Sequence, residues 1–226
     1  GRASTHSATA GAGAAENDGS DTRCGHSPPS HRLDEFTVPA SSLNGKPGSC
    51  EAAQQTLADL VASDSRLLEA YEALLRRVVL PYLKAKLAEG NSAAAGGPTK
   101  FYYQWPPTLR LQPGPSERYV RPHHDGEYGH QPGELNFWMP LTDTSLSQTT
   151  LWVEGSAGAG DYAPLNVNYG EIGAFHGSVL RHHVPPNRSP YTRASLDFRV
   201  GVAGHFDPTW SLRGTKEDHG RREATL

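Results

Sequence analysis

The segment 121–127 (RPHHDGE) places His123 and Asp125 two residues apart. On a β-strand, side chains two residues apart point to the same face, so both can converge on one metal ion while His124 faces away. A neutral imidazole, a carboxylate and a second imidazole make up one triangular face of an Fe(II) site and leave three coordination positions open. Alone, an H-x-D pair is a weak signal in a chain with 11 histidines, where it is as often an ordinary surface or core pair.

Two adjacent histidines, His182 and His183, lie in the run 180–187 (LRHHVPPN) and can supply the second imidazole. On a strand, only one of the two can face the metal. Arg193 and Ser195 follow about one strand later and share a strand face. A guanidinium meets a carboxylate as a two-pronged fork. Arg193 can therefore hold the far carboxylate of 2-oxoglutarate while the other end of this acid chelates the metal, and Ser195 can add a hydroxyl.

His205 and Asp207 form a second H-x-D pair in the same chain. It is followed by His219 alone among the histidines, in a charged segment, and no arginine on a predicted strand comes after it. A metal and co-substrate site would lack its remaining groups there. We therefore interpret this pair as structural.

Composition narrows the class of protein without naming it. The chain has 226 residues, a hydrophobic fraction of 36% and a net charge of -3, which gives no electrostatic reason to expect binding to nucleic acid or to an anionic membrane. No apolar run approaches the ~20 residues that span a bilayer. Cys24 and Cys50 lie in a polar region and are expected to be ordinary thiols rather than a disulfide scaffold. We expect a soluble protein, cytoplasmic or organellar, whose N-terminus at Gly1 is compatible with removal of a leading segment.

The spacing of apolar residues along the chain predicts which segments form the helices and strands that hold these side chains. Residues 1–32 are poor in apolar side chains and are expected to be loosely ordered. A domain over 33–210 is predicted, with apolar residues at helical spacing over 51–90, where Asp64 or Ser65 can cap a helix. Short strands between Pro and Gly turns follow over 100–203 and predict a β-sandwich or a double-stranded β-helix. Residues 211–226 are charged without apolar period and predict a solvated tail.

The motifs together resemble a known family. The run 181–199, with Arg181-His182, Asn187 and TRASLDFR, and the upstream run 123–136, with His-x-Asp-x-Glu-Tyr, are similar to the motifs of the phytanoyl-CoA hydroxylase superfamily. They are closest to its branch of streptomycin-biosynthesis hydroxylases, and 151–156 (LWVEGS) resembles the strand and turn that follow. The resemblance covers about 101–203. It selects His182 as the distal ligand, because the spacing of His182 to Asn187 and Arg193 fits the family pattern.

The resemblance implies a mainly β protein, a double-stranded β-helix (jelly-roll, cupin-like) with N-terminal supporting α-helices. It implies a dioxygenase dependent on Fe(II), 2-oxoglutarate and O2, with metal ligands His123, Asp125 and His182 as the catalytic centre. Such an enzyme hydroxylates or otherwise oxidises an unactivated C–H bond of a small polar metabolite and converts 2-oxoglutarate to succinate and CO2. The carboxylate of Asp125 stands where family halogenases have a small residue, which favours oxidation over halogenation.

Two other functions stay open. One is a non-oxidative cupin-like isomerase or epimerase with the same ligands, against which the Arg193 clamp argues. The other is a catalytically silent metabolite-binding module. The partner expected in each case is a small molecule, with neither nucleic acid nor membrane, and the oligomeric state is open. Strand alternation makes several residues candidates for substrate contact, namely Glu134, Asn136, Trp138, Trp152, Glu154 and His183, although strand packing explains them equally well.

Overall fold

The computed structural model describes residues 33–35, 59–90, 97–210 and 220–226. The expectations for 1–32, for the first part of the helical region (51–58) and for Cys24 and Cys50 lie outside these residues. The first described element is the 3-10 turn η1 (Leu33–Glu35), whose Asp34 carbonyl accepts the backbone N–H of Thr192 at 2.8 Å. In the described part of the chain, no helix has both the length and the apolar character needed to cross a membrane.

The predicted helical region is a run of three joined elements: α3 (Ser65–Leu74), the π-helical η2 (Leu75–Val79) and α4 (Leu80–Gly90). Asp64 caps α3, and its side chain accepts the N–H of Leu67 at 2.9 Å, as the sequence predicts. Pro81 has no N–H to donate to the preceding turn. A π-helical turn just before it takes up this irregularity without ending the helix.

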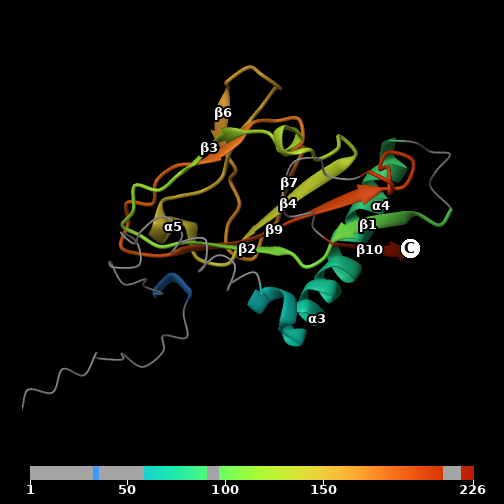
Figure 1. Cartoon of the computed structure of the whole chain (residues 1–226), viewed down its shortest axis with the longest axis horizontal. Helices are drawn as coiled ribbons and strands as arrows, with labels where there is room; N and C mark the ends of the chain where they lie inside the picture. Colours follow the sequence, from blue (N-terminus) through green and yellow to red (C-terminus); the bar gives the residue numbers. More distant parts are fainter. Residues whose placement is uncertain (1–32, 36–58, 91–96, 211–219) are drawn as a thin grey trace, which may run out of the picture. The chain divides into compact units, whose positions relative to one another are not determined.

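Within the described ranges, ten strands form two antiparallel sheets, and the mainly β jelly-roll fold predicted from the sequence is confirmed. The larger sheet is built around β9, which pairs with β1 and β2 along one edge and β4 along the other (Figure 1). Its order is β10 (Arg221–Thr225), β1 (Lys100–Gln104), β9 (Arg193–Val202), β4 (Glu134–Pro140) and β7 (Gly173–Phe175), with β2 (Thr108–Gln112) also on β9. The smaller sheet runs β3 (Val120–His123), β8 (His182–Val184), β5 (Trp152–Glu154) and β6 (Tyr162–Pro164). The short helix α5 (Thr144–Ser147) follows β4.

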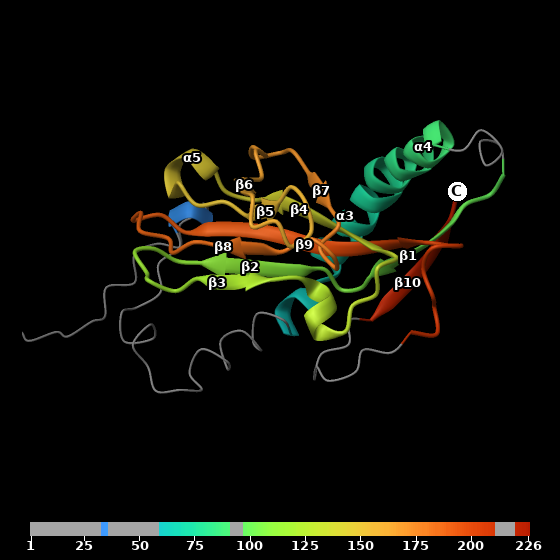
Figure 2. The ribbon, with the colours of Figure 1, turned by 90° about the horizontal axis from the view of Figure 1, so that it is seen from above.

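The two faces of the larger sheet have different roles. One face carries apolar side chains such as Leu196 and Phe198, which pack with Tyr71 and Leu75 of the helices in one buried cluster. Figure 2 shows α3 and α4 beside this sheet. Because β9 alternates, its polar residues point to the opposite face, toward the smaller sheet. That face carries Arg193, Ser195, Asp197 and Arg199.

The prediction of a solvated tail is wrong for the last residues of the chain. Residues 211–219 lie outside the described residues, but Arg221–Thr225 forms strand β10 along β1. Thr99 and Leu226 exchange both backbone hydrogen bonds, and Lys84 donates to the Leu226 carbonyl at 2.9 Å. The strand is held by its main chain and by the buried Ala224, so side-chain periodicity gave no sign of it.

Candidate metal centre

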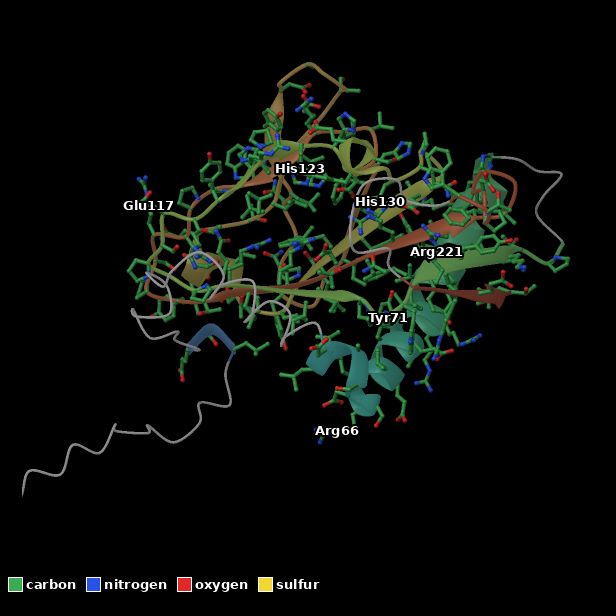
Figure 3. The ribbon with its side chains drawn as sticks, in the orientation of Figure 1. Arg66, Tyr71, Glu117, His123, His130 and Arg221 are labelled. Atoms are coloured by element: carbon green, nitrogen blue, oxygen red, sulfur yellow. The ribbon has the colours of Figure 1, made fainter. Side chains whose placement is uncertain are left out.

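His123, Asp125 and His182 come together between the two sheets, and one ligand atom from each lies within 4.8 Å of the others. The Nε2 atoms of His123 and His182 lie 3.8 Å and 3.5 Å from Oδ1 of Asp125. The two imidazole rings have centroids 4.5 Å apart. Figure 3 labels His123 at the end of β3. Over the described ranges, this is the group of side chains whose spacing suits a metal ion.

A local irregularity brings His123 opposite His182. The two residues are cross-strand partners in β3 and β8, as are Val120 and Val184. Three steps along β3 (120 to 123) thus match two steps along β8 (184 to 182), so β3 carries a bulge between Val120 and His123. Pro122 lies in this bulge, where a missing backbone donor is tolerated.

Asp125 does not lie on the strand that its spacing predicts. We expected one strand over 118–125, but β3 ends at His123, and Asp125 begins the 3-10 turn η4 (Asp125–Tyr128). His124 between them keeps an extended backbone, with φ -113° and ψ 149°. The side chains of His123 and Asp125 therefore still point to the same side. The ring of His124 turns away and meets the carbonyl of Ser178 at 3.1 Å.

The backbone fixes the tautomers of both histidines. Nδ1 of His123 lies 2.7 Å from the carbonyl of Arg121, and Nδ1 of His182 lies 3.1 Å from the carbonyl of Leu180. A carbonyl only accepts, so the proton of each neutral ring is on Nδ1, and Nε2 keeps its lone pair for a metal. Burial lowers the pKa of His123, which favours this neutral form.

Asp125 is buried, with 3% of its surface exposed, and is held as a carboxylate. Burial alone would raise the pKa of Asp125, but the charge of Arg199 and the hydrogen bond from Asn136 outweigh it and hold the pKa well below its usual range. The centre therefore offers the Nε2 atoms of two imidazoles and one anionic oxygen. This donor set suits Fe(II) and related divalent ions.

A cavity of about 340 Å³ adjoins the three residues. Its walls come from both sheets: Trp138 and Arg193 from the larger sheet, His123 and Val184 from the smaller one. Polar and charged side chains outnumber apolar ones in its lining, which suits a polar or charged small molecule. The remaining lining residues are Arg110, Val120, Asp125, Tyr128, His130, Asn136, Leu151, Phe175, His182, Asp197 and Arg199.

Three buried polar atoms of the lining have no hydrogen-bond partner among the described residues: Nε of Arg193, Nε1 of Trp138 and Oδ1 of Asn136. Oγ of Ser195, on the same face of β9 as Arg193, also lacks a partner there, although Ser195 is not among the lining residues. Arg193 lies against the Trp138 ring, with its guanidinium carbon 5.3 Å from the ring centroid. Burial lowers the pKa of Arg193 to about 10, so the group is still a cation at neutral pH. A buried cation with unsatisfied donors beside a cavity fits an anionic ligand.

The structure separates the other predicted contact residues. Asn136 and Trp138 line the cavity, but Glu134 does not: its carboxylate contacts His130 at 2.8 Å and Arg221 at 3.5 Å (Figure 3 labels both). Glu154 accepts the backbone N–H groups of Gly158, Gly160 and Arg181. Trp152 and Tyr162 flank His183, with ring centroids 6.0 Å and 5.0 Å away. His183, Trp152 and Glu154 are thus absent from the cavity lining, whereas His182 belongs to it.

Sequence reasoning assigned no role to two arginines, Arg199 and Arg110, although a strand over 108–112 could point Arg110 into the barrel. Arg199 donates to Asp125, and Arg110 at the cavity forms a two-pronged ion pair with Asp197 at 2.9 Å. Strand parity could have indicated Arg199, since it alternates in step with Arg193 on β9. The second H-x-D pair is structural, as expected: the carboxylate of Asp207 accepts the N–H and hydroxyl of Thr209.

Fold and site define a class: a mainly β protein of two antiparallel sheets with a His–Asp–His group between them. No family model matches the chain. The streptomycin biosynthesis protein StrG of Streptomyces griseus is 33% identical over 107 residues, which are 47% of this chain and 50% of StrG. The chain thus spans about half the length of the curated relative that it matches.

Two solved structures also align with the chain. ThoJ, described as a non-heme monooxygenase in complex with nickel, is 21% identical, with 81% of this chain and 82% of ThoJ covered and a TM-score of 0.42. SnoN, described as a non-heme alpha-ketoglutarate-dependent epimerase from nogalamycin biosynthesis, is 17% identical, with 75% and 68% covered and a TM-score of 0.40. Because both TM-scores are low, the fold assignment rests on the strand order of this chain itself.

Proposed function

We propose that the chain is a non-haem iron dioxygenase that uses 2-oxoglutarate as co-substrate. Its metal ligands are His123, Asp125 and His182, and Arg193 with Ser195 holds the far carboxylate of 2-oxoglutarate. One observation carries the proposal: a two-histidine, one-carboxylate group shares a cavity with a buried guanidinium whose Nε has no partner in the described residues. A non-oxidative isomerase needs no such clamp for a dicarboxylate.

The residues present fit this co-substrate. His123, Asp125 and His182 would hold Fe(II) through three protein ligands, and a site with this donor set would leave room at the metal for 2-oxoglutarate and O2. Nε of Arg193 and Oγ of Ser195 are donors that a carboxylate can satisfy. The indole N–H of Trp138 is a further free donor in the described site. Bound iron and 2-oxoglutarate supply the oxidation of an unactivated C–H bond by O2, with succinate and CO2 as by-products.

The protein's own side chains bind the metal and line the cavity that would hold the substrate. His123 and His182 keep their protons on Nδ1 and present Nε2 inward. Leu151, Phe175 and Val184 supply apolar wall to the cavity and limit the entry of water. The cavity volume of about 340 Å³ suits a small molecule. The 33% identity over 107 residues to a streptomycin biosynthesis protein supports a small polar metabolite as substrate. Hydroxylation as the outcome is proposed because the carboxylate of Asp125 completes the ligand set.

The test is an anaerobic titration of the purified protein with Fe(II) and 2-oxoglutarate, followed by the visible charge-transfer band of the chelate. Wild type is compared with His182→Ala, Arg193→Ala and the matched control His183→Ala. We expect the band in wild type and His183→Ala, its loss in His182→Ala and a weakened titration in Arg193→Ala. Absence of the band in metal-replete wild type would overturn the proposal and favour a metal-dependent isomerase or a silent binding module.

A further inference from the structure

The two carboxylate oxygens of Asp125 have different surroundings. Oδ2 accepts three hydrogen bonds, from Nε and Nη2 of Arg199 at 3.0 Å and 2.8 Å and from Nδ2 of Asn136 at 2.7 Å. Oδ1 instead faces Nε2 of His123 and of His182. All three donors are charged or amide N–H groups in a buried setting, where such bonds are strong.

Strand register explains why two residues reach one oxygen. Asn136 of β4 and Arg199 of β9 are direct cross-strand partners, so their side chains leave the sheet side by side on the same face. Both are buried, with 5% and 9% of their surfaces exposed. Their donors therefore converge on Asp125 from fixed positions in the centre of the larger sheet.

Further contacts hold these two side chains in place. Nη1 of Arg199 donates to Oε1 of Gln104 at 3.2 Å, and Nε2 of Gln104 donates to Thr108 at 2.9 Å. Asn136 packs against Gly177, where an added Cβ would lie 2.5 Å from its Nδ2. Only a glycine at position 177 leaves room for the amide in this orientation. Arg199 is thus fixed from β1 and Asn136 from the loop after β7.

We propose that Arg199 and Asn136 are positioning residues that restrict Asp125 to one-oxygen ligation of the metal. The inference rests on the proposed iron function. A carboxylate that chelated through both oxygens would occupy one of the three open positions, and co-substrate and O2 would then compete for two. With Oδ2 occupied by three donors, only Oδ1 is free to turn toward the ion, and all three positions stay open.

The experiment uses Co(II) as a spectroscopic probe, whose ligand-field absorption reports coordination number without any turnover. Apo protein is titrated with Co(II) for wild type, Arg199→Met, Arg199→Lys and Asn136→Leu. The matched control is Arg66→Met, the same change at an arginine of α3 whose side chain is 91% exposed (Figure 3). Circular dichroism and thermal unfolding of each apo protein establish that it is folded.

We expect Arg199→Met to weaken Co(II) binding about 10–100-fold, because the carboxylate of Asp125 loses its fixed orientation. The absorption spectrum should also change, because the carboxylate can then chelate the ion through both oxygens. Arg199→Lys restores part of the affinity, since it returns one charged donor, and Asn136→Leu gives a smaller loss. Wild-type affinity and spectrum in a folded Arg199→Met would overturn the inference. If that variant does not fold, unchanged affinity and spectrum in both Arg199→Lys and Asn136→Leu would overturn it. Failure of wild type to bind Co(II) would instead overturn the proposed function, and with it the inference.

Discussion

The guanidinium of Arg193 lies 5.3 Å from the centre of the Trp138 ring, and its Nε donates to no group in the described structure. Arg193 is 3% exposed, so its charge has lost water and gained only the ring face and the field of Asp197. Burial accordingly lowers the pKa of Arg193 to about 10. The buried charge of Arg193 therefore destabilises the ligand-free protein, and a bound anion compensates for this cost.

The first prediction is that Arg193→Met stabilises the ligand-free protein. Burial lowers the pKa of Arg193 to about 10 in the folded protein, below the usual value of an arginine in the unfolded chain. At neutral pH the group is therefore protonated in both states, and the full burial penalty applies. Removing the charge should raise the free energy of unfolding by about 1–3 kcal/mol, after loss of the contact with Trp138 is subtracted. Urea unfolding at neutral pH measures the change.

The same variant should lose the stabilisation that 2-oxoglutarate gives to the metal-loaded wild type. In wild type, the penalty should fade as the pH rises through about 10, so the gain from Arg193→Met should shrink there. Arg66→Met is the control for removing an arginine from the surface. A destabilised Arg193→Met that still responds to 2-oxoglutarate would contradict this account of Arg193.

Features that depend on one short segment could be predicted from the sequence. His123 and Asp125 share a face because an extended His124 separates them, and this holds although the strand ends earlier than expected. Parity with Arg193 puts Arg199 on the same face of its strand, but its contact with Asp125 could not be predicted, because this depends on Arg199 lying opposite Asn136. That register arises from pairing between segments far apart in the chain, which no local pattern specifies.

Strand alternation shows which residues share a face, but not which of the two faces points to the cavity, and Trp152 and Glu154 were assigned to the wrong face. Trp152 and Glu154 do share a face, but it is Val153 between them that pairs with His182 and packs beside Trp138. Because alternate residues of a strand point to opposite faces, an assignment that is wrong by one residue reverses every side chain. Trp152 and Glu154 therefore point away from the cavity. His182, and not His183, lies beside His123 and Asp125, in line with the choice made from its spacing to Asn187 and Arg193 in the family that the sequence resembles.

The second prediction concerns β10, which the sequence did not reveal. Ala224 is buried against the apolar cluster of the larger sheet, whereas the side chain of its neighbour Glu223 is 56% exposed and pairs with Lys100 at 2.8 Å. Ala224→Asp should destabilise the protein by about 2 kcal/mol or more, because it buries a charge without a partner. Glu223→Gln, a change on the exposed face of the same strand, should stay within about 0.5 kcal/mol of wild type. Equal effects of the two changes in thermal unfolding would argue against burial of β10.

The third prediction concerns Tyr71, which links the helices to β1. Its hydroxyl donates to the carbonyl of Gln104 at 2.9 Å, inside the apolar cluster. Tyr71→Phe keeps the ring but leaves this carbonyl without its donor, so unfolding should become easier by about 1 kcal/mol. Tyr82→Phe is the control, since Tyr82 is 50% exposed on α4. A Tyr71→Phe protein as stable as Tyr82→Phe would show that the hydrogen bond contributes nothing net.

The last prediction concerns metal binding and stability together. A divalent ion bound to His123, Asp125 and His182 would join β3, η4 and β8, three elements that separate on unfolding. At a metal concentration about 100 times the dissociation constant, binding to the folded state alone adds about 2.7 kcal/mol. Co(II) should therefore raise the melting temperature of wild type, and a chelator should reverse the rise. His182→Ala and His183→Ala each remove one histidine and so change metal binding by the unfolded chain equally. The rise should persist in His183→Ala and vanish in His182→Ala, and a similar rise in both would exclude His182 as the ligand.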